Sequence, residues 1–133
     1  MKLFRFMSDE ERVKLLKGET LENSTDHSLT RGSGSTAKGF CFGIGDEEQA
    51  IKAFRRLSGI VDCENLLVFT VKPERESRFT KCQGRYIDYD EIASEGKTVF
   101  DYPIGLEPWC MFDEYCTTNY SLEDFEEFSW HIE

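Results

Sequence analysis

Only a few side chains in this sequence have the type and the setting for chemistry on a ligand. Arg5 lies in an apolar stretch near the start of the chain, where a guanidinium offers a fixed fork of donors to phosphate or ribose oxygens. The loop RGSGST, residues 31–36, has the composition with which backbone N–H groups can cradle a phosphate. Cys41 stands between two aromatic residues and two glycines, so it is the thiol with the most unusual setting.

Each of these features also has a plainer interpretation. Arg5 can pair with one of the many carboxylates of the chain. A lone histidine, such as His27 in TDHS, more often bonds within its own turn than takes part in catalysis. A glycine- and serine-rich loop that lacks a Walker lysine is usually only a connection. The sequence contains no nucleophile beside a histidine and an acid, and no carboxylate pair with glycosidase spacing.

Length and composition limit the class of protein. The chain has 133 residues, of which 39% are hydrophobic and 14% aromatic, which predicts one domain with a largely aromatic core. It has no apolar run of about 18 residues, so we expect no membrane span. The start, MKLFRFMSDEER, lacks the apolar segment of a secretory signal, so we expect a cytoplasmic location.

The cysteines predict reduced thiols and no zinc site. They stand at positions 41, 63, 82, 110 and 116. None forms a CxxC pair, and no histidine follows at zinc-ligand spacing. We therefore expect most of them to be buried and to act as small hydrophobic side chains.

Charge divides the chain into two unequal parts. Residues 1–85 contain 15 Lys and Arg against 13 Asp and Glu, a net charge of +2, whereas residues 86–133 contain one lysine against 13 acids, a net charge of −12. Such a surface repels nucleic acid and membrane phosphates and attracts basic proteins. The sequence therefore predicts a basic protein surface as partner and disfavours direct DNA or RNA binding.

The apolar pattern predicts the elements that position these side chains. KLFRFM, residues 2–7, alternates like a strand and carries Arg5. Ser8 and Glu11 form a capping box that begins a helix, and Gly18 ends it. The predicted buried side of this helix consists of Val13, Leu15 and Leu16.

The middle of the chain repeats this order after a long loop. Residues 25–39 form the longest predicted loop, and a loop of this length is often functional. FCF, residues 40–42, is a predicted buried strand, and NLLVFTV, residues 65–71, is a predicted central strand. Asp46 caps the helix between them, with Gln49 in the reciprocal position and Gly59 at its end; its predicted core-facing residues are Ala50, Ile51, Phe54 and Leu57.

The last part of the chain is mostly extended in this prediction. Residues 85–92 are expected to form a strand that runs into a turn. Residues 99–106 and 107–115 are expected to form strands interrupted by Pro103 and Pro108. Ser121 and Asp124 then open a final acidic helix over SLEDFEEF. The predicted fold class is α+β, a single domain over residues 1–133 with two early helices and an acidic C-terminal helix.

Two of these segments resemble a known fold. GFCFGIGDEEQAIKAF followed by NLLVFTV looks like the core of the ADP-ribosyltransferase fold, in which a glycine-flanked aromatic strand runs into a helix and a long apolar strand. LFRFMSDEERVKLLKGETLENSTDH is similar to the first strand of that family, with its arginine or histidine, and to the short helix and glycine-containing turn after it. The resemblance covers about residues 2–92 and depends on the order of elements. It implies a mixed or antiparallel split sheet and NAD as the ligand.

The resemblance implies a set of NAD-binding residues. Arg5 would contact the nicotinamide side of NAD, and Ser35 with Thr36 resembles the small hydroxyl motif of the arginine-type branch. Gly39 would let the ligand approach the backbone. Cys41 falls where the histidine-type branch has a tyrosine that stacks on nicotinamide, although a thiol cannot stack in that way.

The family's chemistry also requires a carboxylate late in the chain. The bond between nicotinamide and ribose breaks through an oxocarbenium-like state, which such a carboxylate stabilises. Gly84 and Arg85 stand where a glutamate would be expected, and the substitutes nearest in the sequence are Glu107 and Glu114. The only Glu-x-Glu, residues 74–76, follows the long strand instead. The catalytic set under this interpretation is Arg5, His27 and Glu114.

Two functions remain open at this stage. One is a divergent mono-ADP-ribosyltransferase that binds NAD and modifies or binds a protein target. The other is a catalytically inactive acidic inhibitor, for example a phage-type antagonist of a host nuclease. The charge of residues 86–133 would steer such an inhibitor to a basic protein surface and make its binding sensitive to salt.

Overall fold

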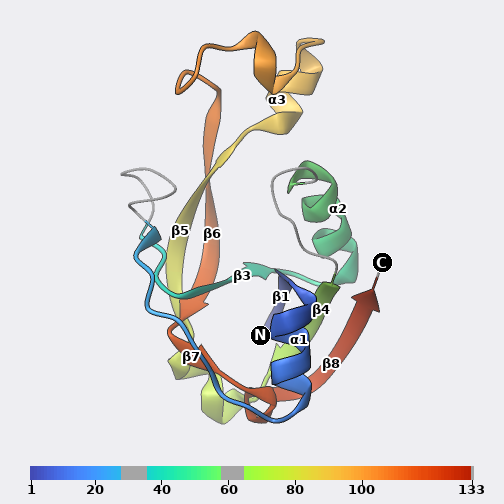
Figure 1. Cartoon of the computed structure of the whole chain (residues 1–133), viewed down its shortest axis with the longest axis vertical. Helices are drawn as coiled ribbons and strands as arrows, with labels where there is room; N and C mark the ends of the chain where they lie inside the picture. The colour runs from blue at the N-terminus through green and yellow to red at the C-terminus, as the bar shows by residue number, and fades with distance from the viewer. Residues whose placement is uncertain (28–35, 58–64, 133) are drawn as a thin grey trace.

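The protein is described by a computed structural model that covers residues 1–27, 36–57 and 65–132. Its main feature is an antiparallel sheet in the order β5-β6-β3-β1-β4-β8 (Figure 1). A second, two-stranded sheet pairs β2 (Leu21–Glu22) with β7 (Asn119–Tyr120). The predicted α+β class is confirmed. The six strands of the main sheet are β1 (Lys2–Met7), β3 (Phe40–Ile44), β4 (Asn65–Val71), β5 (Thr80–Ile87), β6 (Trp109–Thr117) and β8 (Phe125–Ile132).

Strand β1 divides the core into two faces because successive side chains of a strand point to opposite sides. Leu3 and Met7 join the larger cluster, which is covered by α1 (Asp9–Leu16) and by the two-stranded sheet. Phe4 packs with Ala50 of α2 (Glu47–Leu57) on the other side of the sheet. We call these sides the α1 face and the α2 face. Arg5 lies two residues from both Leu3 and Met7 along β1, and it therefore projects into the α1 face.

Aromatic rings fill the α1 face, as the composition predicts. The ring of Phe42 meets those of Phe69, Phe79 and Tyr120 edge to face at 5.5, 5.3 and 5.2 Å between ring centres. Phe40 meets Tyr120 in the same way at 4.9 Å. Such pairs add to the stability that area burial alone provides.

The glycines beside the FCF strand make room for other parts of the same chain. Gly39 has φ +79°, and a Cβ atom there would lie 2.5 Å from the carbonyl oxygens of both Asn23 and Thr117. A Cβ atom at Gly43 would overlap the ring of Phe4, which lies against this glycine. The close approach of neighbouring backbone at Gly39 and of the Phe4 ring at Gly43 therefore explains why both residues are glycines.

The starts of the two early helices are confirmed, but fewer residues of these helices are buried than the sequence predicts. Ser8 accepts from Glu11 N at 3.3 Å, and Asp46 and Gln49 form the reciprocal pair at 2.9 and 3.1 Å. Among the predicted core positions Leu15 and Ala50 are buried. Val13, Leu16 and Ile51 are exposed, because each helix packs on the sheet along a narrow stripe. The side chains of Phe54 and Leu57, and Gly59, lie outside the described residues.

The last third of the chain differs most from the prediction. The expected strand over residues 99–106 is wrong, since this stretch holds the 3-10 turn η3 (Val99–Asp101) and a tight turn. The expected acidic C-terminal helix is also wrong. Ser121 and Asp124 do form a capping box, but it opens only the 3-10 turn η4 (Leu122–Asp124), after which β8 pairs with β4. The open edge of β4 offers a full ladder of backbone hydrogen bonds, a long-range interaction that local sequence does not reveal.

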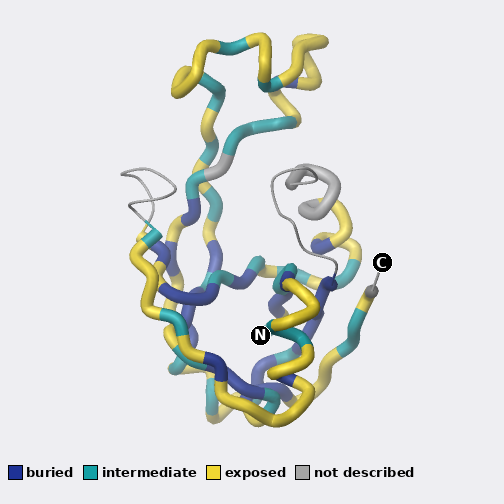
Figure 2. The backbone as a smooth tube through the Cα atoms, in the orientation of Figure 1, coloured by how far each residue is buried: buried dark blue, intermediate teal, exposed yellow. Residues whose placement is uncertain are grey.

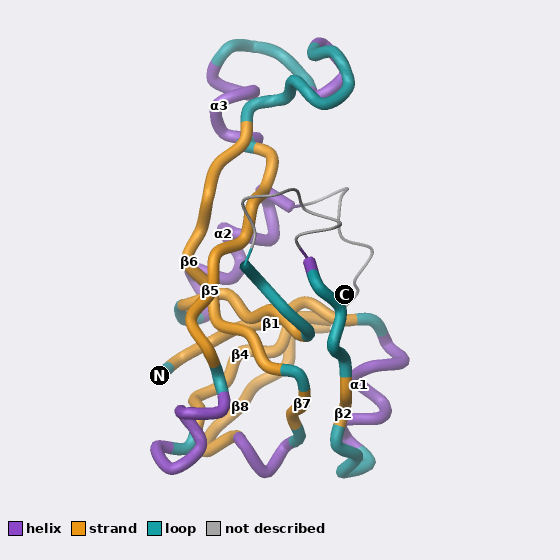
Figure 3. Tube along the Cα trace, turned by 90° about the vertical axis from the view of Figure 1, so that its left-hand side faces the viewer, coloured by secondary structure: helices purple, strands orange, loops and turns teal. Residues whose placement is uncertain are grey.

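Strands β5 and β6 form a long hairpin that projects from the body of the molecule (Figures 1 and 3). Its end, residues 88–108, contains α3 (Tyr89–Ser94) and η3, and we call it the tip. Most of the tip is exposed along its length (Figure 2). Within the described parts of the chain, none of the helices has the length and apolar character that crossing a membrane requires.

Candidate functional site

The candidate site begins with Arg5, which is held by the helix that follows its own strand. The Ser8 cap turns the chain so that the first turn of α1 returns over β1. Arg5 Nε donates to Glu11 Oε2 at 2.9 Å, and Nη2 donates to Oε1 at 2.8 Å. The two side chains are only 18% and 16% exposed. This is a bidentate, mostly buried ion pair, the geometry that a guanidinium fork suits best.

Strand β3 provides the other contacts of Arg5. Nη1 donates to the carbonyl oxygen of Cys41 at 3.0 Å. The rings of Phe40 and Phe42 lie 5.0 and 5.7 Å from the guanidinium carbon, within the range of cation–π attraction. Arg5 and the FCF strand therefore lie side by side. Only the backbone carbonyl of Cys41 takes part in this contact. The side chains of Phe40 and Phe42 point to the α1 face, and the thiol of Cys41, which stands between them in the strand, points to the α2 face.

The electrostatics of this cluster favour the charged guanidinium. Burial opposes the charge of Arg5, but the hydrogen bonds and negative charge of Glu11 outweigh it and raise the pKa of Arg5 above its ordinary value. Burial also raises the pKa of Tyr120, whose hydroxyl feels the charges of both Arg5 and Glu11. That hydroxyl is buried next to the ion pair, where hydrogen bonding with Arg5 and Glu11 also influences its pKa.

Glu114 lies on the opposite side of the sheet from Arg5. Its neighbour Tyr115 pairs with Phe42 and packs on the α1 face, so Glu114 points to the α2 face. It is buried there and stands opposite Cys82 in the β5–β6 register. The structure therefore does not bring Arg5 and Glu114 together.

Three thiols surround Glu114 on the α2 face. Cys41 and Cys116 are direct neighbours across β3 and β6, and Cys82 packs against Cys116. Burial, followed by a hydrogen bond with Cys116, raises the pKa of the Cys82 thiol. In the described part of the chain, no three His, Cys, Asp or Glu side chains form a group that could hold a metal ion.

The remaining predicted site residues join the long loop to the sheet. His27 Nε2 lies 2.6 Å from the carbonyl oxygen of Gly39, and His27 N donates to Ala37 O at 3.1 Å. Thr36 exchanges two hydrogen bonds with Gln83 at the edge of β5, at 3.0 and 2.9 Å. His27, Thr36 and Gly39 thus have structural contacts, and Ser35 lies outside the described residues.

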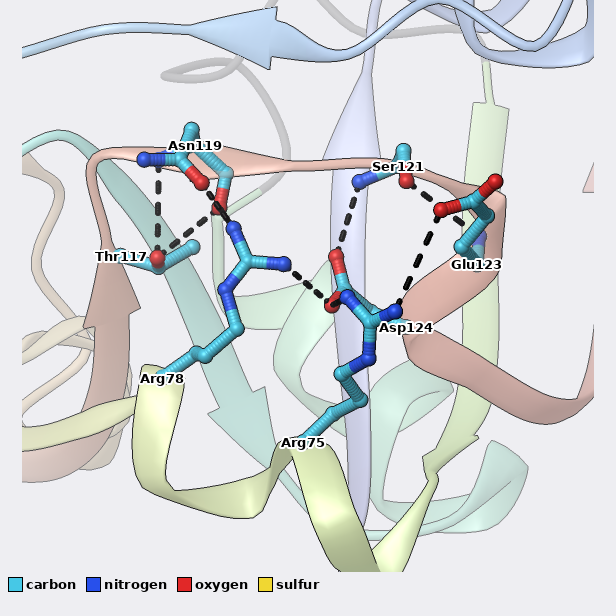
Figure 4. Close-up of polar contacts among 7 residues, drawn as sticks. All are labelled: Arg75, Arg78, Thr117, Asn119, Ser121, Glu123 and Asp124. Atoms are coloured by element: carbon cyan, nitrogen blue, oxygen red, sulfur yellow. Dashed lines mark hydrogen bonds and ion pairs between the residues drawn. The ribbon is translucent and has the colours of Figure 1, made fainter.

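A second polar cluster, which the sequence did not reveal, joins the 3-10 segment η2 (Pro73–Arg78) to η4 (Figure 4). Asp124 is fully buried and accepts from Arg78 Nη1 at 2.7 Å, from Arg75 Nη1 at 3.5 Å and from Ser121 N at 2.9 Å. Arg78 Nη2 also donates to the carbonyl oxygen of Asn119 at 3.3 Å and contacts its Oδ1. Both acceptor oxygens of Asp124 are used within the chain. The capping-box spacing of Ser121 and Asp124 was the one available signal.

Among the described residues, the large apolar side chains with the highest exposure lie in the tip, and the sequence did not reveal them because their apolar content favours a strand. Phe100 is 92% exposed, Ile104 fully exposed and Leu106 71% exposed. Six acids and one lysine accompany them in residues 88–108, a net charge of −5.

Comparison with protein families, with characterised proteins and with solved structures finds no match to this chain.

Proposed function

We propose that this protein is a binding domain that recognises a basic protein surface, on a scaffold that resembles the ADP-ribosyltransferase fold. The observation that carries the proposal is the separation of charge. Residues 86–133 have a net charge of −12, and acids on both the tip and β8 are exposed, among them Glu91, Glu126 and Glu127. A field of one sign over a continuous segment of the chain attracts a partner of the opposite sign and orients it.

The state of Arg5 supports a binding function over catalysis. Its guanidinium already holds a carboxylate on one side and a backbone carbonyl on the other. A dinucleotide phosphate that approached this group would meet the negative charge of Glu11 at the same place. The residues present therefore fit NAD poorly, and we derive no catalytic step from them.

The proposal is tested by capture of partners from a cell extract at low and at high salt. Proteins with a basic surface should bind at low salt and be lost as ionic strength rises. Replacing Glu91, Glu126 and Glu127 by Gln should weaken this binding. The matched control replaces three exposed acids of residues 1–85, which are Glu19, Glu22 and Glu48, by Gln. Partners that resist salt, or equal losses in both variants, would contradict the proposal.

NAD binding is a second candidate function, and it has one specific observation in its favour. Arg5 lies beside the FCF strand, as the resemblance implies. Calorimetric titration with NAD, repeated on Arg5→Ala, tests it. Saturable heat that the substitution abolishes would support an NAD site, and no heat at millimolar NAD would remove this candidate.

A further inference from the structure

We propose that the tip is the surface with which this protein engages its partner, and that the partner presents an apolar pocket surrounded by lysine or arginine side chains. This inference rests on the proposed function and gives it a location. The tip stands at the far end of the β5–β6 hairpin, away from α1 and the two-stranded sheet (Figure 1). It is therefore accessible to a large partner without movement of the body.

Three apolar side chains project from the tip into solvent. They are Phe100, Ile104 and Leu106, with exposed fractions of 92, 100 and 71%. Trp109 and Met111 continue the exposed apolar surface along β6. Exposed apolar side chains that cluster in one place mark interaction sites more often than scattered ones do. A phenylalanine with this exposure is also a suitable anchor for a pocket on a partner.

Internal contacts hold the tip in one conformation. The helix α3 is capped by Asp88, whose side chain accepts from Glu91 N at 3.0 Å, and Ile92 is buried beneath it. The base of the tip is closed by a hydrogen bond from Asp88 N to Pro108 O at 2.8 Å. These contacts order the start and end of the segment before any partner arrives.

The half of the tip that carries the apolar residues is ordered as well. Asp101 accepts from Thr98 N at 2.7 Å in a capping box, and Tyr102 donates to Glu95 at 2.8 Å. A turn closed by Leu106 N and Pro103 O at 3.0 Å, with Gly105 at φ +86°, places Ile104 at its corner. Because the unbound protein already holds the apolar residues in place, binding a partner loses less conformational entropy.

The charge around these residues defines the chemistry of the partner. The single cation of the tip, Lys97, is already engaged, with Nζ 3.4 Å from Glu95 and 5.3 Å from the ring centre of Tyr102. At the base of the tip, the guanidinium of Arg85 is stacked over Trp109 at 4.7 Å. The net charge of −5 in residues 88–108 therefore remains for a partner to complement. A nucleic acid, an anionic membrane and a second copy of this chain would all be repelled.

A defined probe tests this inference on the full chain. The probe is a synthetic helical peptide with a stripe of leucines on one face and lysines along both sides of this stripe. We expect its titration into the ¹⁵N-labelled protein to shift amide signals of residues 88–108. A peptide with serine in place of leucine should bind about tenfold or more weakly, because only the charge then contributes.

Matched variants test whether the tip or another surface of the protein binds the peptide. Replacing Phe100, Ile104 and Leu106 by serine should weaken binding of the lysine–leucine peptide about tenfold or more. Replacing two exposed apolar residues of α1, Val13 and Leu16, by serine should leave it unchanged. Both sets of side chains are exposed in the folded protein, and urea unfolding of each variant checks that the fold is retained.

The outcomes distinguish failure of this inference from failure of the proposed function. Salt-sensitive binding that shifts β8 signals instead of tip signals, or that the tip variant does not weaken, would overturn the inference and leave the proposed function standing. Absence of salt-sensitive binding to the peptide would overturn both. Shifts at the tip that depend on protein concentration without peptide would assign the surface to a second copy, which also contradicts the inference.

Discussion

Arg5 and Glu11 face each other across the turn between β1 and α1, joined by hydrogen bonds of 2.9 Å from Nε and 2.8 Å from Nη2. The pair lies among the rings of Phe40 and Phe42, so each charge depends on the other for compensation. A charge that is removed from water and then loses its partner destabilises the fold strongly. This relationship accounts for an arginine inside an aromatic core.

Glu11→Ala should lower the free energy of unfolding by about 3 kcal/mol, because it leaves the buried guanidinium uncompensated. Urea unfolding measures this change through the transition midpoint. The matched control is Glu10→Ala, which removes an exposed pair with Lys14 at 3.2 Å and should cost less than about 1 kcal/mol.

Replacing both members of the pair should recover much of that loss. Arg5→Met with Glu11→Leu fills the same space with apolar side chains, and such replacements of buried pairs are often neutral or stabilising. If the double variant were less stable than Glu11→Ala, uncompensated charge would not be the cause of the loss.

Gly43→Ala should destabilise the protein by about 1–3 kcal/mol, because the new methyl group meets the ring of Phe4 on the neighbouring strand. The same substitution in a Phe4→Ala background has space for the methyl group and should cost much less. Urea unfolding of the original protein, the two single variants and the double variant gives the coupling energy between positions 4 and 43. Equal costs in both backgrounds would show that the ring does not set the requirement for glycine.

Asp124→Asn should lower the free energy of unfolding by about 3 kcal/mol. The reason is that an amide nitrogen replaces one of the two oxygens that accept hydrogen bonds from Arg78 and Ser121. Thermal and urea unfolding both measure the loss. The control is Glu123→Gln, since that carboxylate is exposed and lies 4.0 Å from Arg75. An effect of Glu123→Gln as large as that of Asp124→Asn would contradict the assignment of the network to Asp124.

The hydroxyl of Tyr102 should ionise only at high pH, because its hydrogen bond to Glu95 and the negative charge of that residue raise the pKa of Tyr102 to about 12. A raised pKa means that the folded protein holds the phenolic proton more tightly than the unfolded chain. The contact therefore stabilises the tip fully below about pH 10, the ordinary tyrosine value, and is lost as pH rises toward 12. The Cζ signal of ¹³C-labelled tyrosine follows this titration, and Glu95→Gln should move it toward pH 10. An unchanged titration in that variant would remove Glu95 as the cause.

Local patterns predicted the first half of the fold well. The strands β1, β3 and β4 and the caps at Ser8 and Asp46 each depend on residues close together in sequence, and all are confirmed. The simple interpretation of Arg5 as part of an ion pair also agrees with the structure. Its partner, Glu11, was already recognised as a capping residue, but the return of α1 over β1 was needed to identify the pair.

The second half depends on long-range interactions, and there the sequence misleads. SLEDFEEF begins with a capping pair that predicts a helix, yet only Leu122–Asp124 forms a short 3-10 turn, and FEEF pairs with β4 as part of β8. The stretch over residues 99–106 contains enough apolar residues to suggest a buried strand, although nothing in the described structure covers Phe100 or Ile104. Apolar content predicts burial only where another element is available to cover it.

The central claim, that Arg5 is used within the fold, is tested most directly by the signal of its side-chain Nε–H during a titration with NAD. The signal is assigned by its loss in Arg5→Lys. The account predicts slow exchange of this proton with water and no shift at millimolar NAD, because Glu11 Oε2 accepts the bond. A saturable shift of this signal, with fast exchange in the free protein, would contradict the account and restore the nucleotide site.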